Sequence, residues 1–523
     1  MASKSNLVNL DAMIKRADFA TSDGDVSSFE TFNNLPARDL ESGAPIVSLL
    51  RKPDFQRETS HWSPEQVVSL LESYISGDLI PSVILWKSPT YLFVIDGGHR
   101  LSVIRAWLED DYGDGPVSHK LFGHDISLEQ KKAAEKTRKL IKDRVGSWAY
   151  FKSLSSDNED ITDDQRRKLS TLMTRGLPVQ WVKGDTDKAE TSFFNINMKG
   201  TPLDDIEEML LRNRRRPVPI AARAIIRAGK GHRYWSAFAS EKTHIIESEA
   251  LSLHKLLFSP EIQKPIRTLD LPLGGSKGVR NAIEVLIDIL LIACRGQQES
   301  LKKVGDFCED ADGDLTINVL RKAKRLIVKI TGNGDGSLGL HPAIYFYGPT
   351  GRHSSAMFLG TVSLIGEKIS NNDKDFFQKF TQIRPQLEEV LILYKSLIAT
   401  ILQKHISQNR VIKHHKFLDR LVNSLNSGES IGEEKLIVFS DLEGKIIAGD
   451  YKRASTRISE EEKSKLFINV ALNAALRCPI CHGYLDVEKS VSYDHIERVR
   501  DGGLGVAGNC QLTHPYCNQS VKC

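Results

Sequence analysis

The pattern of hydrophobic and polar positions predicts short strands and helices in the first part of the chain. Apolar runs at 46–51, 80–86 and 91–95 have the length and composition of strands. At 67–76, leucines and valines fall on one face of a helix, and a Ser-Pro pair just before it supplies an N-cap and a first-turn residue. Residues 1–45 are polar and irregular, which predicts a loosely attached lead-in.

The pattern becomes helical in the middle of the chain. From 220 to about 425, apolar residues recur three and four positions apart, which is the period of an amphipathic helix. The stretch 375–407 predicts one long helix, interrupted at Pro385. A linker is predicted at 426–430, and a further helix at 460–477.

These elements predict an α+β multidomain protein, in line with a length of 523 residues. Its predicted parts are a polar lead-in (1–45), a mixed α and β domain (46–217), a helical scaffold (218–425), a linker region (426–454) and a C-terminal domain with its leader helix (455–523).

The composition is that of an ordinary globular protein and argues against several classes. Hydrophobic residues make up 40% and charged residues 26% of the chain. The N-terminus lacks the apolar core of a signal peptide, and the most apolar run, 282–294, is too short to cross a bilayer. Seven cysteines form no disulfide framework, which favours a reducing cytoplasm. Because the net charge is only +4, nucleic-acid binding requires local basic patches.

The C-terminal residues carry a zinc-binding spacing. Cys478 and Cys481 form C-x-x-C, and His514 and Cys517 form H-x-x-C. Four such ligands suit one tetrahedral, structural Zn²⁺.

A second set of polar residues is interleaved with the zinc pairs. His495 is the candidate general base, because an unperturbed imidazole has a pKa near neutral pH. Asp494 and Asn518 offer oxygen ligands to Mg²⁺ or Mn²⁺, which would take up charge on a scissile phosphate. Asn509 is expected to tie the second loop to the histidine strand through its amide. The set indicates a metal-dependent nuclease site; the alternative is a zinc ribbon without catalysis, serving as a binding module.

Together these residues resemble the HNH, or ββα-metal, endonuclease family in its zinc-ribbon form, which occurs in bacterial restriction and defence nucleases. The fourteen-residue step from His495 to Asn509 and the nine-residue step from there to Asn518 both fit. The resemblance implies His495 as general base and Asn509 as an organiser. It also implies Asp494 and Asn518 as ligands of the catalytic ion. One departure is His514, since cysteine is commoner at that position.

A second motif follows the apolar run 91–95. Asp96, Gly97 and Gly98 predict a tight turn, and His99 and Arg100 begin an amphipathic helix. Backbone N–H groups at such a helix start attract anions, and an arginine fork suits phosphate. Turns of this kind usually serve only to reverse the chain.

In its context this stretch resembles the ParB/sulfiredoxin-like domain of the DGQQR-motif family, found in GmrS-type and SspE-type restriction proteins. The resemblance covers roughly 45–215 and includes Arg57 and an Asn-x-x-Gly segment at Asn197. It implies nucleotide binding or hydrolysis at the turn, and sensing of DNA or of its modification. Gly98 and His99 replace the usual glutamine pair, which favours binding without turnover.

Two basic segments are candidates for contact with a DNA backbone. The first is the predicted helix 131–144, for which a solvated face is the stronger reading. The second is the run containing Arg212, Arg214, Arg215 and Arg216. Its positive charges repel one another unless an anionic group compensates them, so DNA contact and a solvated surface are equally favoured.

The segment 337–353 gathers two histidines and two tyrosines among glycines. His341, Tyr345, Tyr347 and His353 are of the types that stack on an extruded base. The commoner explanation is a core strand with a turn.

The leading hypothesis is a cytoplasmic, metal-dependent HNH endonuclease of a bacterial anti-phage restriction system. Its ParB/sulfiredoxin-like N-terminal domain would sense a nucleotide or modified DNA and license cutting. The expected cofactors are Mg²⁺ or Mn²⁺, structural Zn²⁺ and a nucleoside triphosphate. DNA is the expected partner, and one site per chain favours nicking or a homo-oligomer. The alternatives are a nucleotide-hydrolysing DNA-binding regulator with a non-catalytic ribbon, and a nuclease toxin acting on host nucleic acid.

Overall fold

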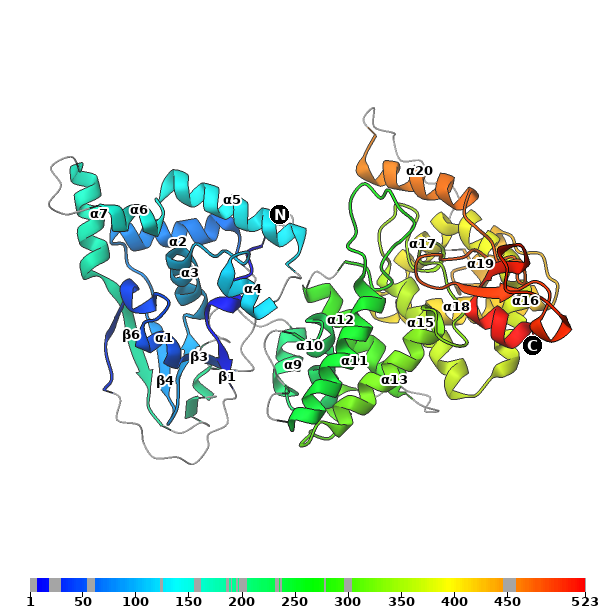
Figure 1. Cartoon of the computed structure of the whole chain (residues 1–523), viewed down its shortest axis with the longest axis horizontal. Helices are drawn as coiled ribbons and strands as arrows, with labels where there is room; N and C mark the ends of the chain where they lie inside the picture. The colour runs from blue at the N-terminus through cyan, green and yellow to red at the C-terminus, as the bar shows by residue number, and fades with distance from the viewer. Residues whose placement is uncertain are drawn as a thin grey trace. The chain divides into compact units, whose positions relative to one another are not determined.

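The computed structural model describes residues 7–17, 30–53, 62–122, 126–154, 161–184, 188–189, 191–193, 196, 205–230, 235, 238–276, 279–295, 303–444 and 458–522. The chain forms two compact units (Figure 1). The first comprises 1–214 with 230–237, and the second comprises 215–229 with 238–523. The finer division predicted from the sequence, with boundaries near 425 and 455, stays a prediction about domains.

A six-stranded sheet organises the first unit. Across the sheet the strand order is β1-β3-β5-β4-β6-β2. The pairs β4–β5 and β2–β6 are antiparallel and the other pairs are parallel. The strands are β1 (Arg16–Ala17), β2 (Asn34–Pro36), β3 (Leu50–Pro53), β4 (Val83–Lys87), β5 (Leu92–Asp96) and β6 (Gly176–Val182).

The described part of the lead-in is not loosely attached, contrary to the prediction. It supplies β1 and β2, which are the two edges of the sheet. Val8, Leu10 and Leu35 are buried in the same core as the central strands. Asp11 is also buried, and its carboxylate pairs with Arg16 Nη2 at 2.7 Å. These strands are too short to show an alternating pattern in the sequence. Their position in the sheet is set by pairing with β3 and β6.

Both faces of the sheet are covered. Along β5, Leu92 and Val94 belong to a large core on one face, whereas Phe93 and Ile95 pack with Trp86 on the other. The larger core also contains residues of α2 and α3. The helices of this unit are α1 (Pro45–Leu49), α2 (Pro64–Ser76), α3 (Gly98–Glu109), α4 (Pro116–Phe122), α5 (Leu128–Arg144), α6 (Trp148–Ser153), α7 (Asp163–Thr174) and α9 (Asp205–Arg212).

The predictions for α2, α3, α5, β4 and β5 are confirmed to within a few residues. At the N-terminus of α2, Ser63 and Gln66 form a reciprocal capping box. The strand predicted at 46–51 is wrong in its first half, because Pro45 starts the helix α1 and the strand begins only at Leu50. A proline at the first helical position favours that outcome.

The second unit is mainly helical, as predicted. Its helices are α10 (Pro217–Ile226), α11 (Ser240–Phe258), α12 (Val279–Cys294), α13 (Asp314–Ile330), α14 (Pro342–Tyr345), α15 (Ser355–Ser370), α16 (Lys374–Leu393), α17 (Lys395–Lys404), α18 (Arg410–Asn426), α19 (Glu433–Phe439) and α20 (Glu460–Asn473). The predicted interruption at Pro385 is wrong, since α16 continues through it and ends near Tyr394. Burial of Phe380 and Leu387 on either side outweighs the cost of a helix-interior proline, about 3 kcal/mol.

The chain ends in a small hairpin that packs within this second unit (Figure 1, red). Strands β7 (Ser492–His495) and β8 (Cys510–Thr513) are antiparallel, with Asp494 opposite Gln511 and His495 opposite Cys510. A single helical turn, η7 (Cys517–Val521), follows β8. None of the helices in the described ranges combines the length and the apolar character needed to cross a membrane.

Candidate functional site

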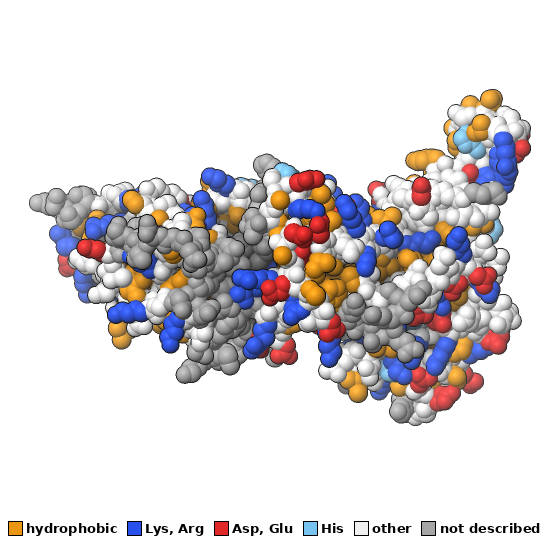
Figure 2. All heavy atoms as spheres, turned by 90° about the horizontal axis from the view of Figure 1, so that it is seen from below, with side chains coloured by type: hydrophobic (Ala, Val, Ile, Leu, Met, Phe, Trp, Pro, Cys, Tyr) orange, Lys and Arg blue, Asp and Glu red, His pale blue; other side chains and the backbone are white. Residues whose placement is uncertain are grey.

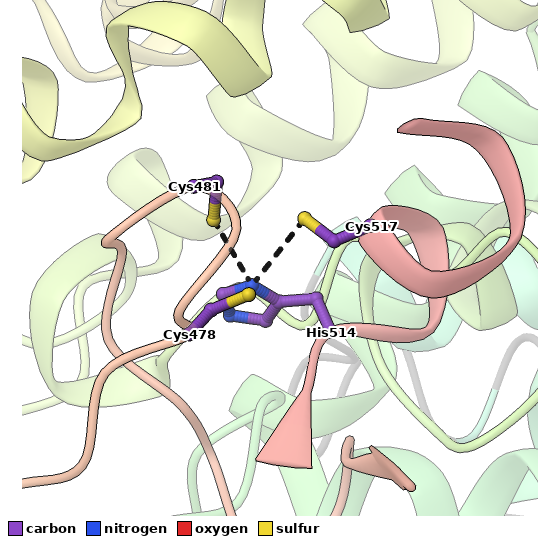
Figure 3. A group of neighbouring side chains, drawn as sticks. All are labelled: Cys478, Cys481, His514 and Cys517. Atoms are coloured by element: carbon purple, nitrogen blue, oxygen red, sulfur yellow. Dashed lines mark hydrogen bonds between the residues drawn. The ribbon is translucent and has the colours of Figure 1, made fainter. Parts of the chain in front are cut away.

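Four side chains converge at the base of the C-terminal hairpin. Cys478 and Cys481 lie on the loop after α20, and His514 and Cys517 lie between β8 and the start of η7 (Figure 3). One ligand atom from each lies within 4.8 Å of all the others, and all four side chains are buried. The two pairs, which are far apart in sequence, therefore form one cluster, as their spacing predicts.

The imidazole of His514 is oriented for metal binding through Nδ1. Its Nε2 lies 2.9 Å from the carbonyl oxygen of Tyr484, an acceptor that requires a proton on Nε2. Nδ1 then faces the thiols, at 3.3 Å from Cys481 Sγ and 3.9 Å from Cys517 Sγ. Burial lowers the pKa of His514, which favours the neutral, metal-binding form. A backbone acceptor that fixes the tautomer is typical of histidine ligands.

The thiols also fit a bound cation. Hydrogen bonds from Cys481 and Cys517 lower the pKa of Cys478. The same contact with Cys478 raises the pKa of Cys481 to about 11 and that of Cys517 as well. A divalent cation at the cluster would stabilise the thiolate form of all three cysteines. Three sulfur atoms and one imidazole nitrogen are a donor set that suits tetrahedral Zn²⁺.

A glycine-rich loop after α13 presses on this cluster. A Cβ atom at Gly339 would come within 2.8 Å of His514 Cδ2, so only glycine permits this approach. The backbone N–H of Tyr516 donates to the carbonyl of Ser337 at 2.9 Å. Gln519 donates to Asp335 Oδ1 at 2.6 Å. The segment that carries His514 and Cys517 therefore contacts the loop after α13 as well as its own hairpin.

Asp494 lies on β7, almost buried, with an exposed fraction of 7%. Its Oδ2 accepts hydrogen bonds from Gln511 Nε2 on β8 and from Lys522 Nζ just after η7, both at 2.8 Å. Neither donor was singled out by the sequence analysis. The only signal for Lys522 is its position one helical turn after Asn518.

Asn509 holds the loop between the two strands closed. Its Oδ1 accepts from the backbone N–H of Glu497 at 2.8 Å. Its Nδ2 donates to the carbonyls of Glu497 and Leu504, at 3.1 Å and 2.9 Å. A Cβ at Gly503 would lie 2.0 Å from the carbonyl oxygen of Glu497 and 2.8 Å from Asn509 Nδ2. The asparagine thus fastens the loop that follows His495, the kind of contact expected of it.

Asn518 joins η7 to β7. Its Nδ2 donates to Ser492 Oγ at 2.7 Å and to the carbonyl of Tyr493 at 3.3 Å. Ser492 and Asp494 lie two residues apart on the strand, so they share one face. Asn518 therefore lies beside the strand face that carries Asp494, and its carbonyl oxygen remains to serve as a ligand.

His495 ends β7 and is partly exposed. A Cβ at Gly505 would lie 3.9 Å from its Nε2, so the loop fastened by Asn509 runs beside the imidazole. The site as a whole offers an imidazole, a carboxylate and an amide oxygen within one hairpin and the turn after it. These are the groups that metal-assisted phosphodiester hydrolysis requires.

The predicted turn in the first unit is also present. Asp96 ends β5, Gly97 has φ of +88°, and Gly98 begins α3. A Cβ at Gly97 would lie 3.0 Å from Val83, so the turn requires glycine there. Arg100 donates to Asp96 Oδ2 at 2.7 Å and to the carbonyl of Ser82 at 3.0 Å. In this state the arginine closes the turn.

The side chain of His99 stacks on Trp62, with ring centroids 5.7 Å apart and planes inclined by 17°. Two further residues assigned to this site, Arg57 and Asn197, lie outside the described residues.

The arginine run lies where the two units meet in sequence. Arg212 pairs with Glu208 at 2.7 Å, and Arg216 donates to the carbonyl of Gly305 at 2.7 Å. Arg214 and Arg215 complete the run, the second of these being exposed. On the face drawn in Figure 2, Lys and Arg side chains are interspersed with Asp and Glu. Part of the repulsion within the run is thus offset by carboxylate and carbonyl oxygens.

The aromatic and histidine cluster at 337–353 is part of the core. His341, Tyr345 and Tyr347 are buried, with exposed fractions of 2%, 3% and 0%. His353 packs against Tyr347 and its Nε2 lies 2.7 Å from the carbonyl of Leu273. Stacking on an extruded base is therefore excluded here, although the segment forms the helix α14 and a turn instead of a strand.

Comparison with known proteins adds a family match in the first unit. Residues 39–215 match the family described as GmrSD restriction endonuclease, N-terminal domain. No curated protein and no solved structure matches the chain. The match includes the Asp96–Arg100 turn and supports a restriction endonuclease, and hence a hydrolase whose partner is DNA.

Proposed function

We propose that the chain is a metal-dependent HNH endonuclease of an anti-phage restriction system, with a catalytic hairpin at its C-terminus. The observation that carries this proposal is the fastening of one short hairpin by a Cys₃His cluster and by two asparagine side chains. A binding module needs only the cluster. The additional fastening of the His495 loop and of the Asp494 strand is what a reaction site needs, because reacting groups must be held rigidly.

Each residue then has a defined task. His495 takes a proton from the attacking water. Asp494 and Asn518 hold Mg²⁺ or Mn²⁺, which stabilises negative charge on the scissile phosphate when bound. Asn509 keeps the loop beside the imidazole. Zn²⁺ at Cys478, Cys481, His514 and Cys517 is structural.

The first unit is proposed to sense a ligand and license cutting. The N-terminus of α3 offers backbone N–H groups, and Arg100 would exchange Asp96 for a phosphate of a nucleotide. The arginine run at 212–216 would contact the DNA backbone. A cytoplasmic location, a ParB/sulfiredoxin-like fold and a homo-oligomer are part of the same proposal.

Incubation of purified protein with plasmid DNA and Mg²⁺ tests the catalytic assignment. We expect His495→Ala to abolish nicking, by roughly a hundredfold or more, while DNA binding persists. The matched control is His482→Asn. His482 is exposed on the loop that carries Cys478 and Cys481, and it has φ of +56°, which asparagine tolerates. Undiminished nicking by His495→Ala would refute the assignment. Gel shifts without any nicking by the wild type would favour a DNA-binding regulator.

A further inference from the structure

Lys522 places an ammonium group at the carboxylate proposed to bind the catalytic ion. Its Nζ donates to Asp494 Oδ2 at 2.8 Å. The same ammonium group also contacts the carbonyl oxygens of His495 and Ile496. Three oxygen atoms of the catalytic strand and its loop therefore surround one positive charge.

The contact is built into the end of the chain. Asn518 and Lys522 are four residues apart, about one helical turn, and they meet Ser492 and Asp494, which are two residues apart on β7. The guanidinium of Arg498 donates to the carbonyl of Lys522 and so fixes the backbone where η7 ends. The side chain of Lys522 is only 20% exposed, which limits its freedom to swing into solvent.

Lys522 and Gln511 converge on a single oxygen. Both side chains donate to Oδ2 of Asp494 at the same distance, 2.8 Å. They hold the carboxylate through Oδ2, which leaves Oδ1 as the oxygen for a metal ion. The two donors differ in one respect, because the amide of Gln511 is neutral and the ammonium of Lys522 carries a full charge.

We propose that Lys522 is a positioning residue that shares Asp494 with the catalytic divalent ion and weakens the binding of that ion. This inference rests on the proposed function, since it needs an ion at Asp494. Orientation of the carboxylate by either donor favours the ion. A unit positive charge on the neighbouring oxygen of the same carboxylate repels a doubly charged ion, and this repulsion outweighs the gain from orientation.

Removal of the two donors by substitution is therefore expected to change the metal affinity in opposite directions. In the DNA-free, zinc-loaded full chain, Lys522→Met should bind Mn²⁺ more tightly, by roughly tenfold. Gln511→Leu removes only orientation and should bind Mn²⁺ more weakly, by roughly tenfold. Lys522→Arg keeps the charge and should remain close to the wild type. Titration of Mn²⁺ followed by electron paramagnetic resonance measures all three affinities without any turnover.

Unchanged or weaker Mn²⁺ binding in Lys522→Met would overturn this inference. A merely structural role for Lys522 predicts that result, because loss of a structural contact does not tighten metal binding. Asp494→Ala separates the inference from the proposed function. If Asp494→Ala leaves Mn²⁺ binding intact, the ion does not bind at Asp494 and both fail; if it abolishes binding while Lys522→Met has no effect, only the role of Lys522 fails.

Discussion

Glu388, in the second half of α16, accepts a hydrogen bond through Oε2 from the backbone N–H of Tyr484, at 2.7 Å and across 96 residues of sequence. The carbonyl of Tyr484 in turn lies 2.9 Å from His514 Nε2. The carboxylate of Glu388 is thus connected through the backbone N–H and C=O of one residue, Tyr484, to a proposed zinc ligand. The zinc cluster and α16 form one continuous polar structure inside the second unit.

The other oxygen of Glu388 completes this structure. Its Oε1 accepts from Arg384 Nε at 2.8 Å and from the hydroxyl of Tyr345 at 3.1 Å. Arg384 also donates to the carbonyls of Leu338 and Gly339, and Gly339 lies against His514. Glu388 and Arg384 are 0% and 2% exposed, so each compensates a charge that would otherwise be buried alone.

We predict that Glu388→Gln destabilises the second unit by about 3 kcal/mol, because it leaves the charge of Arg384 buried without its partner. The measurement is chemical denaturation of the zinc-loaded protein. Asp375→Asn is the matched control, because Asp375 forms an exposed ion pair with Lys379 on the same helix. That change should cost at most about 0.5 kcal/mol. Equal losses in the two variants would contradict a stabilising role for the buried network.

Removal of zinc is predicted to destabilise the helices α14 and α16 as well as the C-terminal segment that carries the Cys₃His cluster. Without the ion, His514 loses its place against Gly339 and its hydrogen bond to Tyr484 weakens. The contact of Tyr484 with Glu388 of α16 then weakens too, and α14 is affected because Tyr345 donates to the same carboxylate. Hydrogen exchange before and after treatment with a chelator should show faster exchange in both helices. Helices α2 and α3 of the first unit serve as the internal reference and should not change. Protection that persists in α14 and α16 would show that the ribbon unfolds alone.

The local parts of the candidate site are predictable from the sequence. The spacing of the two zinc pairs and the positions of Asp494, His495 and Asn509 are short-range patterns, and the structure brings the zinc pairs together. Strand and helix bounds in the central part of the first unit follow from periodicity for the same reason.

Long-range partners escaped prediction because no local pattern encodes them. Lys522 and Gln511 meet at Asp494 only once the hairpin and η7 have formed. Glu388 looks like an ordinary charged helix residue in sequence, yet it is fully buried. The lead-in strands β1 and β2 likewise depend on pairing with β3 and β6.

Gly503→Ala is predicted to lower nicking by roughly tenfold or more without preventing zinc binding. The new Cβ would lie 2.0 Å from the carbonyl of Glu497 and would displace the Asn509 amide from the loop beside His495. Single-turnover nicking of plasmid DNA measures this effect. Gly508→Ala is the control in the same loop, because no atom lies within 4 Å of its added Cβ. If both variants cut alike, the Asn509 fastening has no role in catalysis.

Acid sensitivity of the second unit is predicted to depend on His414. This residue is buried in α18 beside Gly360 of α15, and burial lowers its pKa to about 3. Unfolding returns its pKa to about 6.5, so between these values the unfolded chain binds a proton that the folded chain does not. Its contribution to stability is complete above about pH 6.5 and declines as the pH falls, by about 1 kcal/mol per pH unit.

His414→Leu removes that titration while keeping an apolar side chain at the position. Stability measured by denaturation between about pH 7 and about pH 5 should therefore fall less steeply for His414→Leu than for the wild type, by about 1 kcal/mol per pH unit. His482→Asn is the control, because His482 is exposed. This variant would lose zinc in acid to the same extent as the wild type, so zinc loss cannot cause a difference between them. Its pH profile should match that of the wild type. Parallel profiles for His414→Leu and the wild type would mean that His414 is protonated in the folded protein, against the burial that the structure shows.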